Sequence, residues 1–424
     1  MRSFSLSRYR IGQLGRVTTG KTPSSEFPHL FGRVAPFLTP TDMDGRSRYV
    51  KAGRMLSNEG AEAQRQLALP ANSICVVCIG ATIGKVCMTD QVSFTNQQVN
   101  SVVVNRASHD PLFVYYVFQT LTDELRAKAG GAATPIINKS AFEALEVELP
   151  PLEFQGQIAG ILSAYDDLIE NCQRRIRLLE DMARGLYREW FVHFRFPGAD
   201  ALPRVDSPLG PIPQGWTAAS LPECADVNPR AKVPREGDKP FVPMGCLANG
   251  SMLITDVAVR SGNSGAKFQN GDTLFARITP CLENGKTGFV QFLPDAQAVA
   301  FGSTEFIVLR SRTLTPEFVY LLARSDAFRH TAIKSMTGAS GRQRVQEKCF
   351  DNYLIAQPPR EMLDRFSAIV APSFRLIQQL HLRTDNLRRT RDLLLPRLLS
   401  GHITLASAEP DLASSSAAAM SSLV

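Results

Sequence analysis

The feature that most constrains this chain of 424 residues is that its second half repeats its first. A constant shift of 208 residues brings nine identical residues into one ungapped register. The identical pairs are Phe142 with Phe350, Pro150 with Pro358, Pro151 with Pro359, Glu153 with Glu361, Ile161 with Ile369, Leu168 with Leu376, Ile169 with Ile377, Leu179 with Leu387, and Leu186 with Leu394. So long a period indicates two domains of one kind and excludes a solenoid of short units.

The segments upstream of this register also correspond, now with small insertions. SFTNQQVNSVVV is similar to FGSTEFIVL, and the tripeptide Phe-Val-Tyr occurs at 113–115 and again at 318–320. Gly84-Lys85 is matched by Gly285-Lys286. Each copy is therefore expected to consist of a mixed domain followed by a long helix.

Apolar residues at spacings of three and four predict long helices over 148–195 and 358–402. An apolar stripe of that length needs a partner, and we expect the two helices to pair as an antiparallel coiled coil. The residues predicted to pack between the helices are Ile161, Leu168, Ile169, Ile176, Leu179, Leu186, Ile369, Ile377, Leu387 and Leu394. The alternative is that each helix packs only on its own domain. Pro372 is expected to break or restart the second helix, and Thr384 and Arg391 to dilute its apolar stripe.

Residues 1–147 and 213–357 combine strand-length runs of Val, Ile and Phe with short helical segments, which is typical of α+β domains. The segment 196–212 is rich in proline and glycine and is predicted to be a linker. Residues 403–424 have low complexity and are predicted to be disordered. The formal charge is +4 over residues 1–151 and +3 over 213–359, so both copies could contact a polyanion.

Polar loops containing glycine or proline recur at matched places in the two copies. They are 18–25 with 228–234, 80–85 with 281–286, 96–98 with 303–305, and 130–138 with 338–345. Amide, hydroxyl and charged side chains of these types read base edges, and lysines suit phosphates. The candidate DNA-binding residues are Lys21, Thr22, Lys85, Asn96, Gln97, Gln98, Thr134, Lys232, Arg277, Lys286, Ser303, Thr304, Glu305, Arg342 and Arg344. A solvated loop is the alternative for each residue taken singly.

Motifs for chemistry are missing from the sequence. The two glycine-lysine turns do not fit the phosphate-binding loop GxxxxGK[ST], and the sequence has no GxGxxG, no HExxH and no Asn/Asp-Pro-Pro-Tyr/Phe. Cys75 and Cys78 form a CxxC without a second pair, so buried packing is favoured over a zinc site. We therefore expect no catalytic residue, no metal and no cofactor on this chain. With no long apolar run and few cysteines, a cytoplasmic location away from membranes is expected.

The segments LPPLEFQGQIAGILSAYDDLIENCQRRIRLLEDMARGLYREWFVHF and LLLPRLLSGHI resemble the specificity subunits of type I restriction–modification systems. GATIGK with NQQ, TTGKTP, PIPQGW and STEF with FVYLL extend the resemblance over roughly residues 10–404. The resemblance implies two target-recognition domains, each reading one half of a split double-stranded DNA sequence, and two helices that fix the spacer.

The same resemblance implies partner proteins. Two modification subunits would dock on the helices, bind S-adenosylmethionine and methylate adenine, and restriction subunits would supply ATP- and Mg²⁺-dependent translocation and cleavage. Two other functions stay open: a stand-alone DNA-binding adaptor that self-associates through its helices, and an enzyme with an unrecognised active site.

Overall fold

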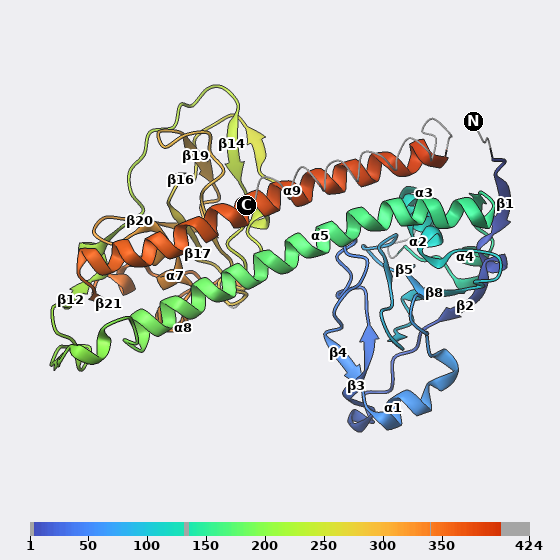
Figure 1. Cartoon of the computed structure of the whole chain (residues 1–424), viewed down its shortest axis with the longest axis horizontal. Helices are drawn as coiled ribbons and strands as arrows, with labels where there is room; N and C mark the ends of the chain where they lie inside the picture. The colour runs from blue at the N-terminus through green and yellow to red at the C-terminus, as the bar shows by residue number, and fades with distance from the viewer. Residues whose placement is uncertain (1–3, 131–134, 340, 400–424) are drawn as a thin grey trace. The chain divides into compact units, whose positions relative to one another are not determined.

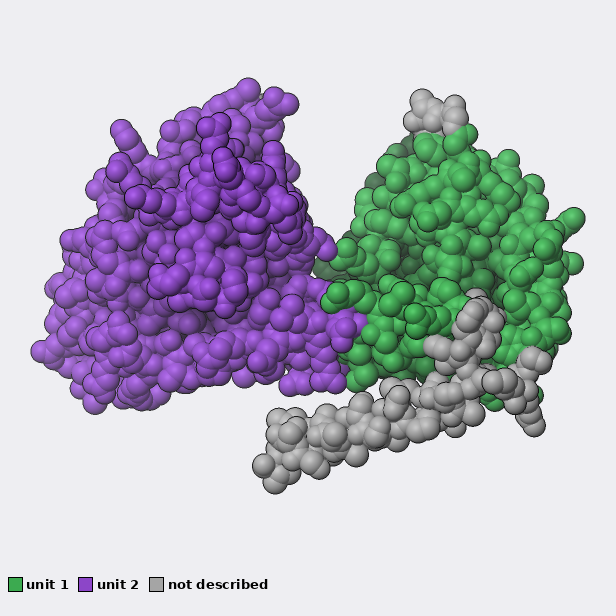
Figure 2. Space-filling view, turned by 90° about the horizontal axis from the view of Figure 1, so that it is seen from above, with its two compact units in different colours: residues 1–169, 387–424 green, residues 170–386 purple. Residues whose placement is uncertain are grey.

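The computed structural model describes residues 4–130, 135–339 and 341–399 (Figure 1). The chain divides into two compact units, residues 1–169 with 387–424 and residues 170–386 (Figure 2). The two long helices, α5 (Leu152–Tyr187) and α9 (Arg360–Leu399), each contribute residues to both units. Each unit therefore contains a globular part and a portion of both helices.

In unit 1, the largest sheet is antiparallel and has the strand order β2-β8-β5-β6. A second sheet has the order β4-β3-β7, in which β3 and β7 are parallel, and β1 pairs with β9. The strands are β1 (Ser7–Arg10), β2 (Gly15–Thr19), β3 (Phe31–Leu38), β4 (Arg54–Leu56), β5 (Ile74–Val77), β6 (Val86–Met88), β7 (Phe94–Thr95), β8 (Val99–Val104) and β9 (Glu146–Leu149). The short helices are α1 (Asn58–Ala63), α2 (Pro111–Thr120), α3 (Thr122–Lys128) and α4 (Lys139–Glu143).

Unit 2 repeats this topology, except that its second sheet has one more strand. Its largest sheet has the order β13-β20-β17-β18, its second sheet the order β15-β14-β19-β16 with β14 and β19 parallel, and β12 pairs with β21. The strands are β12 (Thr217–Ser220), β13 (Ala225–Val227), β14 (Lys239–Val242), β15 (Ala258–Arg260), β16 (Ala266–Gln269), β17 (Thr273–Ala276), β18 (Thr287–Phe289), β19 (Val299–Gly302), β20 (Phe306–Ser311) and β21 (Leu354–Gln357). The strand β16 is an addition to the second copy. The α+β class and the internal duplication predicted from the sequence are confirmed.

A matched helix follows the long central strand in each unit, and its start is encoded locally. Asp110 caps α2, accepting from the Phe113 amide at 2.8 Å, and Thr315 caps α7 (Pro316–Arg324), accepting from the Phe318 amide at 3.4 Å. In both helices proline is the first residue, where its missing N–H is no loss. Phe113 and Phe318 then bury completely on the sheet, which fixes the helix against it.

The CxxC cysteines pack on opposite faces of β5. Cys75 belongs to a buried cluster with Leu38 and Val99, whereas Cys78 belongs to the main core of unit 1 with Val76. Successive side chains of a strand alternate between faces, so residues three apart point in opposite directions. The interpretation of these thiols as packing groups is confirmed.

The two long helices pack against each other antiparallel. In unit 2, the ring of Phe191 in the π-helical turn Arg188–Val192 that continues α5 lies 4.8 Å from that of Phe366 near the start of α9. In unit 1, Leu395 and Leu398 near the end of α9 are buried in one cluster with Ile158 and Leu162 of α5. The start of one helix therefore meets the end of the other, and the alternative in which each packs only on its own domain is wrong.

Pro372 does not break the second helix, contrary to the expectation from sequence. The helix α9 runs without interruption from Arg360 to Leu399. Val370 and Phe374 on either side of the proline are buried in the core of unit 2, while Pro372 itself faces outward. Burial of both neighbours outweighs the loss of one backbone hydrogen bond, which costs about 3 kcal/mol.

The residues predicted to pack between the helices differ in burial. Ile169, Ile176 and Ile377 are buried, while Ile161, Leu179, Leu186, Leu387 and Leu394 are half-buried. Leu168 and Ile369 are 38% and 52% exposed, so neither belongs to the buried seam of this chain. Thr384 lies in the seam, and its hydroxyl donates to the Leu380 carbonyl at 2.8 Å.

The segment predicted as a linker is partly folded. The strands β10 (Arg204–Val205) and β11 (Ile212–Pro213) form a short hairpin, and Trp216 stacks on Phe196 at a ring distance of 5.4 Å. The tail 403–424 lies outside the described residues. Within the described part of the chain, no helix has the length and apolarity needed to cross a bilayer. The predicted domain boundaries stay predictions.

Candidate nucleic-acid interface

Three of the four pairs of matched loops lie at the same end of the largest sheet in their own unit, and the described part of the fourth is bridged to that end through Ile136 in unit 1 and Arg344 in unit 2. In unit 1, Thr19 at the end of β2 pairs with Asn100 at the start of β8, and Val77 at the end of β5 pairs with Val99. The loops that follow β2 and β5 and the loop that precedes β8 therefore lie together at one end of the sheet. The equivalent strands of unit 2 have the same order and directions, so its loops gather in the same way.

Hydrogen bonds tie the loops of unit 1 to one another. The Thr22 hydroxyl donates to the Gln97 side-chain oxygen at 2.8 Å, and the Cys78 amide donates to the Gln98 carbonyl at 2.8 Å. The Gly80 amide donates to the Pro135 carbonyl at 3.0 Å. The first two bonds join the loop at 18–25 and the end of β5 to the loop at 96–98, and the third joins the loop at 80–85 to the described part of the loop at 130–138. Gln97 is exposed at the centre of the group, with its amide nitrogen unused among the described residues.

Asn96 has a structural role in that loop. It is 8% exposed, donates to the Gln98 side-chain oxygen at 2.9 Å, and accepts from the Gln98 amide at 3.1 Å. Its amide therefore holds the turn, and Gln97 is the side chain presented outward.

The two glycine-lysine turns are equivalent in geometry as well as in sequence. Lys85 donates to the Met43 carbonyl at 2.6 Å, and Lys286 donates to the Met244 carbonyl at 3.2 Å. Both glycines have positive φ, 89° at Gly84 and 71° at Gly285. These lysines link each turn to a segment 42 residues earlier in its own unit. The turn recurs because its lysine ties it to that earlier segment, a role that the sequence pattern alone did not reveal.

Two ion pairs hold the loops of unit 2. Arg344 binds Glu305 through two nitrogens at 2.7–3.0 Å, and Arg277 donates to Glu347 at 2.6 Å. The backbone at Arg344 also bridges that at Ile278. The hydrogen bond with Glu305 raises the pKa of Arg344 above its ordinary value. Glu305, one of the candidate DNA-binding residues, is thus engaged within the protein, and a base would have to compete with Arg344.

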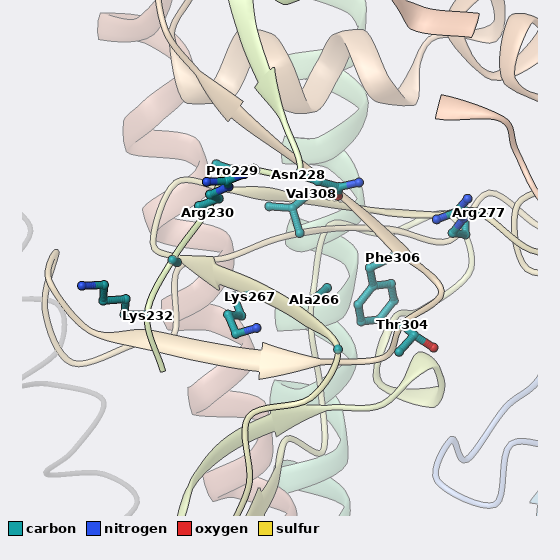
Figure 3. A pocket seen from close by; sticks show the side chains of 12 residues that line it. Asn228, Pro229, Arg230, Lys232, Ala266, Lys267, Arg277, Thr304, Phe306 and Val308 are labelled. Atoms are coloured by element: carbon teal, nitrogen blue, oxygen red, sulfur yellow. The ribbon is translucent and has the colours of Figure 1, made fainter. Parts of the chain in front are cut away.

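A basic cleft of about 800 Å³ opens beside these loops in unit 2 (Figure 3). Its described lining contains the basic side chains of Arg230, Lys232, Lys267 and Arg277 and no acidic side chain. Thr304 also lines it, so three predicted residues (Lys232, Arg277 and Thr304) share one cavity wall. In Figure 3, Lys232 and Arg277 lie at opposite ends of the view. Four cations around one cleft favour an anionic ligand such as a phosphodiester.

Arg230 and Lys267 are functional candidates that the sequence interpretation missed. Arg230 lies in the matched loop 228–234, where only Lys232 was singled out. Lys267 lies on β16, the strand that the first copy lacks, so no matched loop pointed to it. The loop begins at Asn228, whose φ is 51° and whose side chain accepts from the Val308 amide at 2.9 Å.

Three of the predicted basic residues are free. Lys21, Lys232 and Arg342 are exposed, and none has a side-chain partner among the described residues. They can neutralise phosphates without first breaking an internal bond. Ser303 is half-buried and holds its own turn by accepting from the Glu305 amide at 3.2 Å. Thr134 lies outside the described residues. The contacts of all these residues with DNA stay predictions.

A family model described as the type I restriction modification DNA specificity domain matches residues 7–181. The type I restriction enzyme MjaIX specificity subunit of Methanocaldococcus jannaschii is 25% identical over 411 residues, covering 93% of this chain and 92% of the relative. The type I restriction enzyme HindI specificity subunit of Haemophilus influenzae is 34% identical over 176 residues, covering 40% of this chain and 38% of the relative.

The chain is thus similar, over nearly its whole length, to a specificity subunit of a type I restriction–modification system. A solved structure of such an S subunit, from M. genitalium, aligns with a TM-score of 0.56 at 15% identity, covering 94% of this chain and 97% of that one. At this identity the likeness concerns the fold alone. The matched loop groups are the candidates for a DNA-binding surface in this chain.

Among the described residues, no group of three or more His, Cys, Asp or Glu side chains is arranged to hold a metal ion. The polar residues of the loop groups are mostly amides, hydroxyls and cations. This set is suited to hydrogen bonding and charge neutralisation. It offers no nucleophile paired with a base.

Proposed function

We propose that this chain is a type I specificity subunit and reads a split double-stranded DNA sequence, one half through the loops of unit 1 and the other through the loops of unit 2. The observation that carries the proposal is that both units present three matched loops at the same end of the same sheet, with different side chains. Gln97 is the exposed residue of one central loop and Thr304 that of the other. Identical scaffolds with dissimilar contact groups suit two different half-sites.

The proposal divides the work between backbone and base contacts. Lys21 in unit 1 and Lys232, Lys267 and Arg342 in unit 2 would neutralise phosphates, because they are exposed or line the basic cleft. Gln97 and Thr304 would face base edges. Lys85, Lys286 and Arg344 would position the loops through their bonds within the protein.

The antiparallel helices would fix the distance between the half-sites and dock two modification subunits. Those subunits would bind S-adenosylmethionine and methylate adenine, and restriction subunits would add ATP- and Mg²⁺-dependent cleavage. The chain itself would bind none of these cofactors and catalyse no step. Rigid coupling of two weakly binding recognition units raises the affinity for the whole site, since the second half-site is bound at a high effective concentration.

Methylation-aware sequencing of a host that expresses the chain with its modification subunits tests the proposal. The wild-type chain should produce one split motif. Gln97→Ala should relax only one half of that motif, and Thr304→Ala only the other. Glu148→Gln, on the separate sheet formed by β1 and β9, serves as the control and should leave the motif unchanged. An unsplit motif, or one substitution that relaxes both halves, would contradict the proposal.

A further inference from the structure

A buried polar network lies between the helices in unit 1. The Asp166 carboxylate on α5 accepts from the Arg391 guanidinium on α9, and it accepts from the Tyr116 hydroxyl on α2 at 2.6 Å. The side chains of Asp166 and Arg391 are 4% and 7% exposed. Arg391 also donates to Asp392 at 2.7 Å and 2.9 Å. Burial and the neighbouring Asp166 raise the pKa of Tyr116, so its hydroxyl keeps the proton that it donates.

The second copy of the fold has no such network at the matched places. The shift of 208 residues relates Asp166 to Phe374 and Arg391 to Ala183, and the Phe-Val-Tyr match relates Tyr116 to Leu321. Phe374, Ala183 and Leu321 are 2%, 4% and 2% exposed and belong to one apolar cluster of unit 2. The duplicated seam is therefore polar at these places in one copy and apolar in the other.

Both helices keep one register, so the polar position in unit 1 and the apolar position in unit 2 are equivalent positions along the helix pair. Phe191 lies 25 residues after Asp166, and Phe366 lies 25 residues before Arg391. The Asp166–Arg391 contact in unit 1 and the Phe191–Phe366 contact in unit 2 therefore belong to one antiparallel register. In the same register, Ala183 of α5 is matched with Phe374 of α9. Since α5 and α9 are copies of one helix, α5 could also pair with the α5 of a second chain.

Pairing of identical helices would separate the members of the network. In that register, Asp166 of one α5 would be placed against Ala183 of the other, and Arg391 of one α9 against Phe374 of the other. Asp166 would be buried without its cation, and Arg391 would keep only the exposed Asp392 of its own helix, which is strongly unfavourable. A single buried polar pair can thus select one helix arrangement over others of similar apolar contact.

We propose that the Asp166–Arg391–Tyr116 network specifies pairing of α5 with α9 within one chain and disfavours association of two chains through identical helices. The network stabilises the chain less than an apolar seam of the same size would, and its effect is on the choice of partner helix. This role does not depend on which DNA sequence the loops read, so it can fail or hold independently of the proposed function.

Refolding of the full chain at increasing concentration, followed by sedimentation velocity, tests the proposal. The variant Asp166→Phe/Arg391→Ala/Tyr116→Leu transfers the apolar set of unit 2 to unit 1. Its association constant for dimer formation should exceed that of the wild type by about tenfold or more, the change that ~1.4 kcal/mol produces. The reciprocal variant Phe374→Asp/Ala183→Arg/Leu321→Tyr makes both places polar, and its dimer fraction should rise in the same way.

The control is Asp166→Arg/Arg391→Asp, which exchanges the two charges between α5 and α9. The ion pair then still occurs only in unit 1, and unit 2 keeps its apolar residues. This variant should refold with the wild-type dimer fraction. Dimers formed through another surface would be equally abundant in all variants, because the altered positions are buried. The proposal is overturned if the symmetrised variants dimerise no more than the wild type, or if the inverted control dimerises as they do. Failure of both symmetrised variants to fold, judged by circular dichroism, would also overturn it, since the two sets would then not be interchangeable.

Discussion

At the scale of single residues, the fold separates lysines that could contact DNA from lysines that build the loops. Lys85 and Lys286 each donate to a backbone carbonyl, whereas Lys232 is exposed in the wall of the basic cleft. A cation that must leave an internal partner gains less from a phosphate than a solvated one. The free cations are therefore where phosphate contacts should be sought first.

Lys232→Ala should weaken DNA binding about equally for all sequences and lower the salt dependence by about one phosphate contact. The reason is the loss of one neutralised phosphate and its released counterion. Binding constants measured by fluorescence anisotropy over a salt series give both quantities. Lys334→Ala, at the end of α8 (Asp326–Lys334), is the matched control. An unchanged salt slope for Lys232→Ala would contradict the assignment.

His109 should make the fold sensitive to mild acid. Its side chain is 4% exposed, packs edge-on against Tyr9 at 4.9 Å, and has a pKa lowered from 6.5 by burial. The unfolded chain takes up a proton as the pH falls through 6.5 and the folded chain takes it up only at a lower pH, so stability decreases between those two pH values. Urea unfolding at about pH 7.5 and about pH 5.5 should show a loss of up to roughly 1 kcal/mol per pH unit from this group.

His109→Gln should remove that part of the pH dependence. The exposed residue His330 provides the comparison, since His330→Gln should leave the pH dependence as it is in the wild type. Equal slopes for His109→Gln and the wild type would rule out His109 as the source.

At the scale of secondary-structure elements, tertiary packing overrides local helix signals in both long helices. α5 includes Gly156, Gly160 and Gly185, and α9 includes Pro372, yet both helices are continuous. None of the three glycines has another atom within 4 Å of where a side chain would begin, so packing does not require glycine there. The helices persist because their apolar stripes are buried, which outweighs about 1 kcal/mol for each glycine.

Pro372→Ala should stabilise α9 by about 1–3 kcal/mol, because it restores a backbone donor at an outward-facing position. The change in the urea midpoint, monitored by circular dichroism, measures this effect. Ala371→Gly is the opposite test and should destabilise the same helix by about 1 kcal/mol. If Pro372→Ala lowered the midpoint, the proline would have a packing role that its exposure does not suggest.

At the scale of the whole molecule, the chain is one module written twice, with the helices shared by both units. Each unit has its own buried core, and each core takes residues from α5 and from α9. Neither globular part is complete without the helix contributed by the other copy. This arrangement is what would make helix length a determinant of half-site spacing under the proposed function.

Shortening both helices should shorten the DNA spacer while leaving both half-sites unchanged. Deleting about seven residues from each helix preserves the phase of the apolar stripe and removes about 10 Å of rise, or about three base pairs. The matched deletions are 171–177 and 379–385. Methylation-aware sequencing reads out the new spacer. A constant spacer, or loss of one half-site, would refute a ruler made by the helices.

The sequence by itself determined the duplication, the α+β class, the two long helices and the family resemblance, because these depend on repeats and periodicity within each segment. It also located the four loop groups, since matched loops recur at matched places. The tertiary structure alone decided which side chains in those loops are free. Lys286, Arg344 and Asn96 are held by partners far along the chain or in the same turn, and no local pattern encodes such bonds.

The same holds for the helix seam. In the sequence, Arg391 is a charged residue that interrupts an apolar stripe, and no local pattern explains a charge there. Only the fold brings it to Asp166, 225 residues away in the chain, and turns two unfavourable burials into one compensated pair. Periodicity is a property of one helix, whereas the stability of a buried charge depends on what the partner helix places beside it.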